Sequence, residues 1–386
     1  MAHPSHPIVR PMPVPSSSPP PLTVRSATVE VLRIFDVAEG IDLDRVEQLL
    51  AGKGTVARIR LARVEPKAIA FGDPPVVTEL VAPALDVLGR RCETRAAARI
   101  HAFGVISISL DVLLPEPLPW PEFEAFAREA EREAAGLRFW RERLDALLGV
   151  VRPAMDDPSK TQVEEDYAII TLREVDPSLD GTPLADAVDL VPLLTHDSRP
   201  LSEPARAEVL RYTHSYYRDD AVVITWDRAL VLEPAGDDDV ADVLEVANAQ
   251  LLELRVYDAR LDREIPRIYD VAEGVQRRGV ALFQRRYSRA ANGMRALVAE
   301  ISEITEKVDN ALKVTEDVYL ARVYTSALEL FRVPALAASI DRKLALIRET
   351  YTALYDQAVA ARSEWMEAAI VLLIVLEVVM ALVAGH

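Results

Sequence analysis

Six histidines are the side chains of this 386-residue chain best suited to metal binding or to proton transfer near neutral pH. They are His3, His6, His101, His196, His214 and His386. No HExxH pattern or other zinc-ligand spacing joins them. The acidic run Asp237–Asp239 could also bind a metal, but it directly precedes an expected helix, where acids commonly face the positive end of the helix dipole. The sequence therefore predicts neither a metal site nor a cofactor.

Nucleophilic and phosphate-binding motifs are missing from the sequence as well. There is no Walker phosphate loop, no dinucleotide-binding glycine fingerprint and no GxSxG, and fourteen glycines leave little scope for one. The single cysteine, Cys92, excludes an intrachain disulfide and a cysteine-rich metal site. We therefore expect a protein that is not an enzyme. The alternative is a membrane-bound enzyme whose site lies between two mixed α/β units of the chain.

Five arginines gather in one expected helical region of an otherwise acidic chain. They are Arg277, Arg278, Arg285, Arg286 and Arg289. The net charge of −17 and the isoelectric point of about 4.9 argue against a general nucleic-acid-binding surface. Such a cluster is most often a solvated helix face, but it could contact anionic lipid headgroups, RNA or an acidic partner. Only Phe283 and Tyr287 interleave it, which weakens the hypothesis of single-stranded RNA binding.

The most apolar stretch, residues 368–384 (AAIVLLIVLEVVMALVA), predicts a membrane anchor. Its eleven Ile, Val and Leu residues would contribute about −3 to −7 kcal/mol to insertion, against about +2.5 to +3.5 kcal/mol for ionised Glu377. We therefore expect a single-pass C-terminal transmembrane helix in a lipid bilayer; the alternative is a buried helix of a soluble bundle. The residues expected to form the anchor are Trp365, Ala368, Ile370, Leu373, Leu376, Glu377, Leu382 and Ala384.

Glu377 is the only charged residue of that stretch. It is either protonated and facing lipid or paired with another helix, and pairing would imply self-association or a protein partner. Arg342, Lys343, Arg348 and Arg362 precede the anchor, so the positive-inside rule predicts that the soluble part lies in the cytoplasm. The Ala-, Val-, Leu- and Arg-rich composition is typical of a GC-rich bacterial genome. The expected location is therefore a bacterial inner membrane.

The first three-fifths of the chain are expected to be an α+β domain. Residues 1–26 are rich in Pro and Ser and are expected to be disordered. Residues 27–235 alternate between strand and helix patterns. The order strand, helix, hairpin occurs in residues 28–150 and again in residues 164–233, which suggests an internal duplication.

Several local signals place elements within this domain. Residues 28–35 alternate like a strand, and Asp42 is expected to cap the helix that follows. Two alternating runs at 94–112 flank a short turn that ends at Gly104, which predicts a hairpin. Residues 184–194 are expected to form one helix.

Residues 236–362 are expected to form an antiparallel helical or coiled-coil bundle that acts as a stalk. Its apolar seam is about five heptads long. Pro266 should kink or split the first helix, and Pro334 should close a later one. The last helix is expected to begin near Ala335 and to run without a break into residues 363–386, the membrane anchor.

Three segments resemble the RMD1 family, also called the DUF155 domain. Residues 247–254 (ANAQLLEL) are similar to the family's Ala-Gln-Ser segment and the apolar helix after it. Residues 363–367 (SEWME), which precede the apolar stretch with its internal Glu377, resemble the Leu-Glu-Trp motif before the family's anchor. Phe103–Gly104–Val105 would match a Phe-Gly-Val strand. Residues 330–334 (LFRVP) lack the family's aromatic Pro-Phe-Tyr-Trp-like segment, so the chain resembles a divergent member.

The resemblance implies a tail-anchored membrane protein without a known enzymatic site. Mitochondrial relatives are linked to translation and are thought to tether ribosomes to the membrane. We therefore expect a membrane scaffold or tether that holds a partner through its α+β domain and its stalk. The alternative is an anionic-lipid- or RNA-binding module that uses the Arg277–Arg289 segment.

Overall fold

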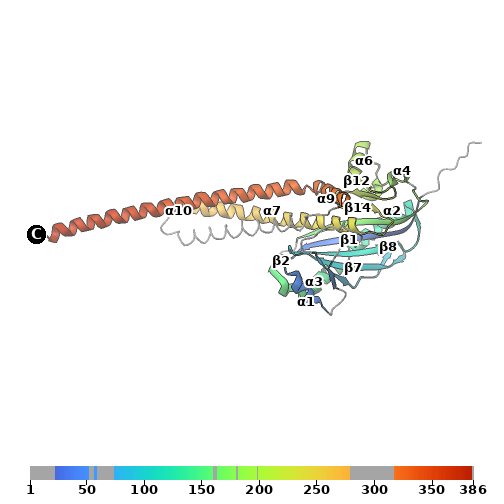
Figure 1. The fold of residues 1–386 in the computed structure, drawn as a ribbon, viewed down its shortest axis with the longest axis horizontal. Helices are drawn as coiled ribbons and strands as arrows, with labels where there is room; N and C mark the ends of the chain where they lie inside the picture. Colours follow the sequence, from blue (N-terminus) through green and yellow to red (C-terminus); the bar gives the residue numbers. More distant parts are fainter. Residues whose placement is uncertain are drawn as a thin grey trace, which may run out of the picture.

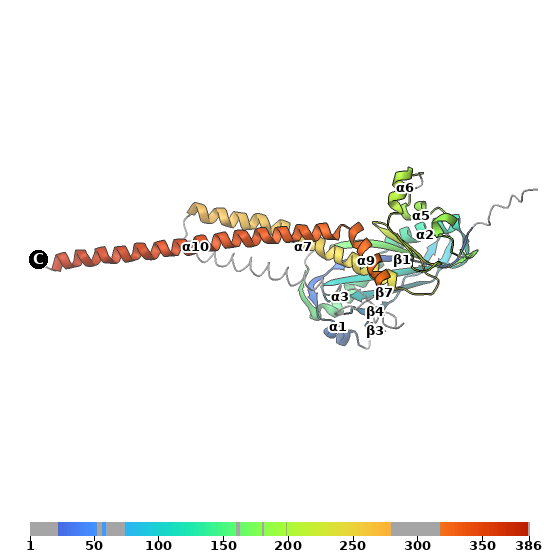
Figure 2. The same cartoon turned by 45° about the horizontal axis from the view of Figure 1, so that its top comes forward.

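The computed structural model describes residues 22–51, 56–58, 74–159, 163–179, 181–197, 199–278 and 317–384. They form an α+β domain around one ten-stranded sheet, from which two long helices project (Figures 1 and 2), so the mixed α+β class is confirmed. Along the sheet the strands are β12 (Thr213–His214), β13 (Ala221–Ile224), β14 (Arg228–Leu232), β11 (Glu164–Asp176), β1 (Thr23–Asp36), β8 (Val105–Leu113), β7 (Thr94–Ile100), β4 (Val76–Leu80) and β3 (Val56–Arg58).

Shorter strands complete the described β-structure. β9 (Leu118–Pro119) pairs with the start of β1. Two small sheets pair β2 (Ala38–Ile41) with β10 (Met155–Pro158) and β5 (Leu85–Val87) with β6 (Arg90–Cys92). β1 begins inside the segment expected to be disordered, because Thr23 pairs with Asp176 of β11 and with Pro119 of β9.

β1 and β11 lie at the centre of the large sheet and pair antiparallel, from Thr23 opposite Asp176 to Phe35 opposite Glu164. β8 and β7 continue antiparallel on one side of β1. On the other side, β14 runs parallel to β11. The two halves differ in strand direction, since β8 runs antiparallel to β1 whereas β14 runs parallel to β11, and they meet in the β1–β11 ladder. The expected internal duplication stays a prediction.

The β7–β8 hairpin forms where the sequence predicts it. Gly104 ends the turn with φ +92°, and a Cβ there would lie 1.8 Å from the carbonyl oxygen of Ala38. The Gly104 carbonyl accepts hydrogen bonds from the N–H groups of Val37 at 3.0 Å and Ala38 at 3.2 Å. Glycine is needed here both for the backbone conformation and for the close approach of the chain that leads into β2.

Helices cover one face of the sheet, where Val31 and Ile170 are buried. Phe123 of α2 and Trp140 of α3 pack in this layer.

Asp42 caps α1 as expected, because its side chain accepts the N–H of Arg45 at 3.0 Å. The helices before the stalk are α1 (Leu43–Leu50), α2 (Trp120–Ala135), α3 (Phe139–Val151), the 3₁₀ turn Arg152–Ala154, α4 (Leu184–Ala187), α5 (Val191–Thr195) and α6 (Glu203–Val209). The single helix expected at 184–194 is thus two short helices.

The other face of the sheet is covered by α7 (Asp239–Arg278), α9 (Val318–Leu330) and the start of α10 (Val333–Ala384). Leu32 and Ile169, the chain neighbours of Val31 and Ile170, pack here, as the alternation of side chains along a strand requires. α7 and α10 leave the sheet domain in the same direction, and α10 extends farther (Figures 1 and 2). We refer to α7 and α10 as the stalk.

The two described stalk helices, α7 and α10, run parallel (Figures 1 and 2). The expected antiparallel packing involves the segment between them, residues 279–316, which lies outside the described part, and it stays a prediction. α7 continues through Pro266 without splitting. Pro334 lies in the first turn of α10, where a missing N–H costs little, and the chain turns just before it at Arg332, with φ +56°. The expected unbroken helix from the bundle into the apolar stretch is confirmed, since α10 is one helix of 52 residues.

Candidate functional site

The base of the stalk is held to the sheet by charged side chains that are buried or half-buried. Arg99 on β7 donates to Asp242 at 2.7 Å and also to Glu245, both in the first turns of α7. Ser107, opposite Arg99 in the β7–β8 ladder, donates to the other oxygen of Glu245. Removing one partner of such a cluster would leave an uncompensated buried charge. The cluster therefore fixes how α7 leaves the sheet.

Carboxylates outnumber the arginine in this cluster. Burial outweighs the attraction of Arg99 and raises the pKa of Asp242 to about 7, with a further contribution from Glu245. Burial likewise raises the pKa of Asp111, on the adjacent strand β8, to about 6. Burial acts to lower the pKa of Arg99, but Glu245 and Asp242 outweigh it and raise that pKa. Arg99 is thus permanently charged, while Asp242 and Asp111 can take up protons near neutral pH.

His101 lies beside this cluster but does not belong to its hydrogen bonds. Its Nε2 is 4.0 Å from Glu245 and has no hydrogen-bond partner, and its ring stacks 5.0 Å from that of Phe103. Burial and the nearby Arg99 lower its pKa to about 3. His101 is therefore a neutral, packed side chain at physiological pH.

Further along the stalk, other ion pairs join α7 to the sheet domain, and here the arginines lie on α7 and the carboxylates on the sheet domain. Arg260 of α7 donates to Glu39 at 2.6 Å, and Arg255 pairs with Glu165 of β11. Farther out, Lys343 of α10 pairs with Asp258 of α7 at 2.8 Å. Side chains on both helices thus hold the stalk as one piece with the sheet domain.

At its far end, α10 exposes apolar side chains on every side. All ten apolar residues between Ile370 and Met380 are at least half exposed, and Leu372 is 71% exposed. Ile370, Leu373 and Leu376, which the sequence assigns to an anchor, belong to this run. Glu377 interrupts it and is exposed too. We call Ile370–Met380 the apolar tip. An amphipathic helix of a soluble bundle would bury one face, and no described residue covers this one.

Other predicted site residues are not placed at the level of side chains. The backbone of Trp365, Ala368, Leu382 and Ala384 belongs to α10, but their side chains lie outside the described part. The same holds for Arg277 and Arg278 at the end of α7. Arg285, Arg286 and Arg289 lie outside the described residues altogether. Contact of this arginine segment with lipid, RNA or an acidic partner stays a prediction.

No helix within the described part of the chain combines the length and the apolar composition needed to cross a membrane. The structure therefore does not support the transmembrane part of the expected architecture.

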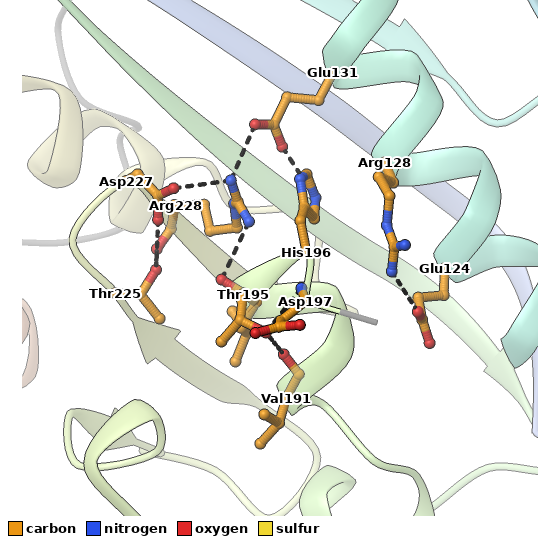
Figure 3. A network of polar contacts seen from close by, with 11 residues as sticks. Glu124, Arg128, Glu131, Val191, Thr195, His196, Asp197, Thr225, Asp227 and Arg228 are labelled. Atoms are coloured by element: carbon orange, nitrogen blue, oxygen red, sulfur yellow. Dashed lines mark hydrogen bonds and ion pairs between the residues drawn. The ribbon is translucent and has the colours of Figure 1, made fainter. Parts of the chain in front are cut away.

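On the face opposite the stalk, a buried arginine organises a second polar site (Figure 3). Arg228 of β14 is only 5% exposed. It donates to the carbonyl of Leu194 at 3.2 Å, to Glu131 of α2 at 3.2 Å and to Asp227 at 2.9 Å. The second oxygen of Glu131 lies 3.5 Å from Nε2 of His196. Arg228 and Glu131 thereby tie the end of α5 to the sheet and to α2.

His196 adopts an unusual backbone conformation at this point. It ends α5 with φ +52°, a region that few residues other than glycine occupy. Burial lowers its pKa to about 4, and the charge of Arg228 adds to that effect. Burial raises the pKa of Glu131, although Arg228 opposes it. The imidazole is therefore neutral at physiological pH, and its Nε2 faces Glu131 without forming a hydrogen bond to it.

A pocket of about 410 Å³ opens beside this network, between α2 and the segment from α5 to α6. In its wall, Arg128 donates to Glu124 at 2.8 Å, and Arg206 makes two 3.0 Å hydrogen bonds to Asp189. The charged or apolar residues that line it are Glu124, Arg128, Asp189, Val191, Pro192, Asp197, Arg199, Pro200, Leu201 and Arg206. We call it the α2–α5 pocket.

A metal centre is not evident in the described part of the chain, where no three or more His, Cys, Asp or Glu side chains are arranged to hold an ion. The α2–α5 pocket lies between the two α/β units, where the alternative of a membrane-bound enzyme places its site, but none of its lining residues was predicted from the sequence. Its members come from residues 124–128 and 189–206, and no motif links such distant segments. No pattern in the sequence predicts the left-handed backbone conformation of His196 either.

Comparisons with known proteins identify the sheet domain. Residues 26–239 match the family described as "Uncharacterized protein MJ0711, N-terminal domain". The chain belongs to this family. The match ends at the first residue of α7, so the MJ0711 N-terminal domain corresponds to the sheet domain and excludes the stalk.

A member of the MJ0711 family from Methanocaldococcus jannaschii, "Uncharacterized protein MJ0711", is 25% identical over 195 residues. The alignment covers 50% of this chain and 58% of the relative, so the chain spans little more than half of that relative's length. No solved structure matches the chain significantly. Neither match bears the name of the RMD1 family, and membership of that family stays a prediction.

Proposed function

We propose that the protein is a membrane-associated scaffold or tether without catalytic activity. Its apolar tip inserts into a lipid bilayer, and its stalk holds the MJ0711-type sheet domain away from the lipid, where that domain binds a protein partner. The observation that carries the proposal is the run of ten exposed apolar side chains between Ile370 and Met380.

The free energy of the apolar tip favours lipid over water. Nine of its exposed residues are Ile, Val or Leu, and at about −0.3 to −0.6 kcal/mol each they contribute about −3 to −5 kcal/mol to insertion. An ionised Glu377 opposes this by about +2.5 to +3.5 kcal/mol. The balance is narrow and favourable, and neighbouring residues of the apolar stretch add to it.

The geometry of the stalk supports a role as a spacer. α10 has 52 residues, and a helix of that length extends about 78 Å. Leu344 and Ile347 of α10 are buried in the core shared with α7, and Lys343 pairs with Asp258 of α7. The apolar tip and the sheet domain therefore lie at opposite ends of a stiff element (Figure 1).

The charge around the stalk supports a cytoplasmic location of the sheet domain. Arg342, Lys343 and Arg348 lie on α10 on the domain side of the apolar tip. An excess of basic residues on this side favours the cytoplasmic face of a membrane. The resemblance to the RMD1 family, whose members are anchored by their C-terminal ends, is consistent with this arrangement.

Vesicle flotation tests the proposal directly. The full chain should float with lipid vesicles, and a chain truncated after Met366 should stay in the aqueous fraction while keeping the circular dichroism spectrum of a folded α+β domain. A matched control is a chain that keeps the tip but carries Arg277→Gln and Arg278→Gln, which should float like the parent. Flotation of the truncated chain would show that another surface binds the membrane and would overturn the proposal.

A further inference from the structure

We propose that the α2–α5 pocket binds a small soluble ligand through one oxyanion group, a carboxylate or a phosphate. The inference goes beyond the role as a tether and does not depend on it. Its volume of about 410 Å³ lies within the range of about 300 to 1,000 Å³ typical of small-molecule sites.

The guanidinium groups of the pocket differ in what they already bind. Arg206 is paired with Asp189 through two hydrogen bonds of 3.0 Å, so a carboxylate already compensates its charge. Arg128 donates one hydrogen bond, to Glu124 at 2.8 Å. Because a guanidinium has five N–H donors, most donors of Arg128 are not used by this contact. Among the described residues, no side chain forms a hydrogen bond or ion pair with the guanidinium of Arg199, whose backbone N–H donates to Asp197. Arg199 and Arg128 therefore have donors left for a ligand.

Planar guanidinium groups bind carboxylate and phosphate oxygens in a two-pronged geometry, which makes an oxyanion the ligand that these donors fit best. The carboxylates of Glu124, Asp189 and Asp197 also line the pocket and would repel a second negative group. Val191 and Leu201 provide an apolar wall. The chemistry of the lining thus fits a ligand with one oxyanion and an uncharged or cationic remainder.

The end of α5, which leads into the pocket wall that contains Arg199, is fixed by contacts on the side away from the pocket. His196 turns away from the pocket to Glu131, while its neighbours Thr195 and Asp197 line the pocket (Figure 3). Arg228 fixes the carbonyl of Leu194. A strained residue such as His196 persists only where the surroundings impose it. Because the wall is preorganised, a ligand would lose little affinity to ordering it.

The position of the pocket argues for a ligand from solution. α5 and α6 lie at the end of the molecule away from the C-terminus of α10, as Figure 2 shows. A phospholipid headgroup at the apolar tip would therefore not reach the pocket.

Arginine modification by phenylglyoxal tests the site with defined probes. The full chain in detergent micelles is treated with the reagent, and the rate at Arg199 and Arg128 is read by mass spectrometry with inorganic phosphate, with acetate, or with sodium chloride at equal ionic strength. At a probe concentration of about twice its dissociation constant, the free fraction of the site falls to about one third, so modification of both arginines should slow about threefold. Arg45, exposed on α1, should react at an unchanged rate.

The two anions distinguish the two kinds of ligand. Protection by phosphate alone indicates a phosphate-bearing ligand, protection by acetate alone indicates a carboxylate, and protection by both indicates a site that accepts either oxyanion. Arg199→Gln should abolish the protection of Arg128, whereas Arg45→Gln should not change it. Equal rates with and without both anions, or equal protection by chloride, would overturn the proposal.

Discussion

Arg99 and Asp242 are separated by 143 positions in the chain and form an ion pair of 2.7 Å that joins the sheet to the first turn of the stalk. Glu245 binds the same guanidinium one turn later. The pair lies where the MJ0711-type domain ends and α7 begins. It is thus the point at which a domain shared with relatives is coupled to the stalk of this chain.

Replacing Arg99 should destabilise the protein strongly. Arg99→Met removes the only arginine that contacts Asp242 and Glu245 in the described structure, and leaving a buried carboxylate unpaired costs about 3 kcal/mol. Urea unfolding of the full chain in detergent, followed by fluorescence, measures this loss. The matched control is Arg95→Met on the same strand, whose side chain is 67% exposed and whose loss should cost less than about 0.5 kcal/mol. Equal costs for the two variants would contradict a structural role of the buried cluster.

Stability should fall as the pH rises toward neutrality. The pKa of Asp242 is raised from 3.8 to about 7, so Asp242 binds a proton in the folded state that it lacks when unfolded. Its contribution to stability is complete below about pH 4 and is lost as the pH rises through 7. His101 and His196, whose pKa values are lowered, act in the opposite direction. The contribution of Asp242 must therefore be isolated by a variant.

Asp242→Asn should make the free energy of unfolding less dependent on pH between about 4 and 7, by up to about 1.4 kcal/mol per pH unit. Urea unfolding across this range measures the slope. Asp86→Asn, at an exposed position of β5, should leave the slope of the parent unchanged. A slope that is the same in all three proteins would show that Asp242 does not take up a proton on folding.

Gly104→Ala should unfold the β7–β8 turn or the whole sheet domain. The new Cβ would lie 1.8 Å from the backbone oxygen of Ala38, and the backbone at φ +92° is unfavourable for alanine. The combined cost should exceed about 3 kcal/mol. Thermal unfolding monitored by circular dichroism gives the measure. Gly149→Ala, where a Cβ meets no atom within 4 Å, is the control and should be neutral or stabilising within about 1 kcal/mol. Similar melting of both variants would refute this account of Gly104.

Glu377→Leu should increase membrane binding and reduce self-association. The substitution removes an insertion cost of about 2.5 to 3.5 kcal/mol, and it removes the group that would pair with a second helix within lipid. Flotation measures the first effect, and crosslinking in vesicles measures the second. Glu367→Leu, at an exposed position of α10 before the apolar tip, controls for the added leucine. Unchanged crosslinking of the Glu377 variant would mean that this acid does not mediate pairing.

Patterns confined to neighbouring residues were sufficient to predict individual elements. The alternation around Gly104 predicts the β7–β8 hairpin, and Asp42 caps α1 as its type and position suggest. The unbroken helix that leads into the apolar tip follows from the absence of Gly and Pro after Pro334. The expected split at Pro266 is wrong, because α7 continues through it, whereas α9 does end just before Pro334, at Leu330.

The sequence by itself determined the α+β class, the long terminal helix and its apolar end, since each depends on the period of side chains along a few turns or on composition. The tertiary structure alone decided that β14 runs parallel to β11, that the two stalk helices leave in one direction, and that Arg228, Glu131 and His196 meet. These features join residues that lie tens of positions apart in the chain, as the 97 positions between Glu131 and Arg228 show. Such contacts depend on how the layers pack against each other, and a local pattern of side chains carries no information about that packing.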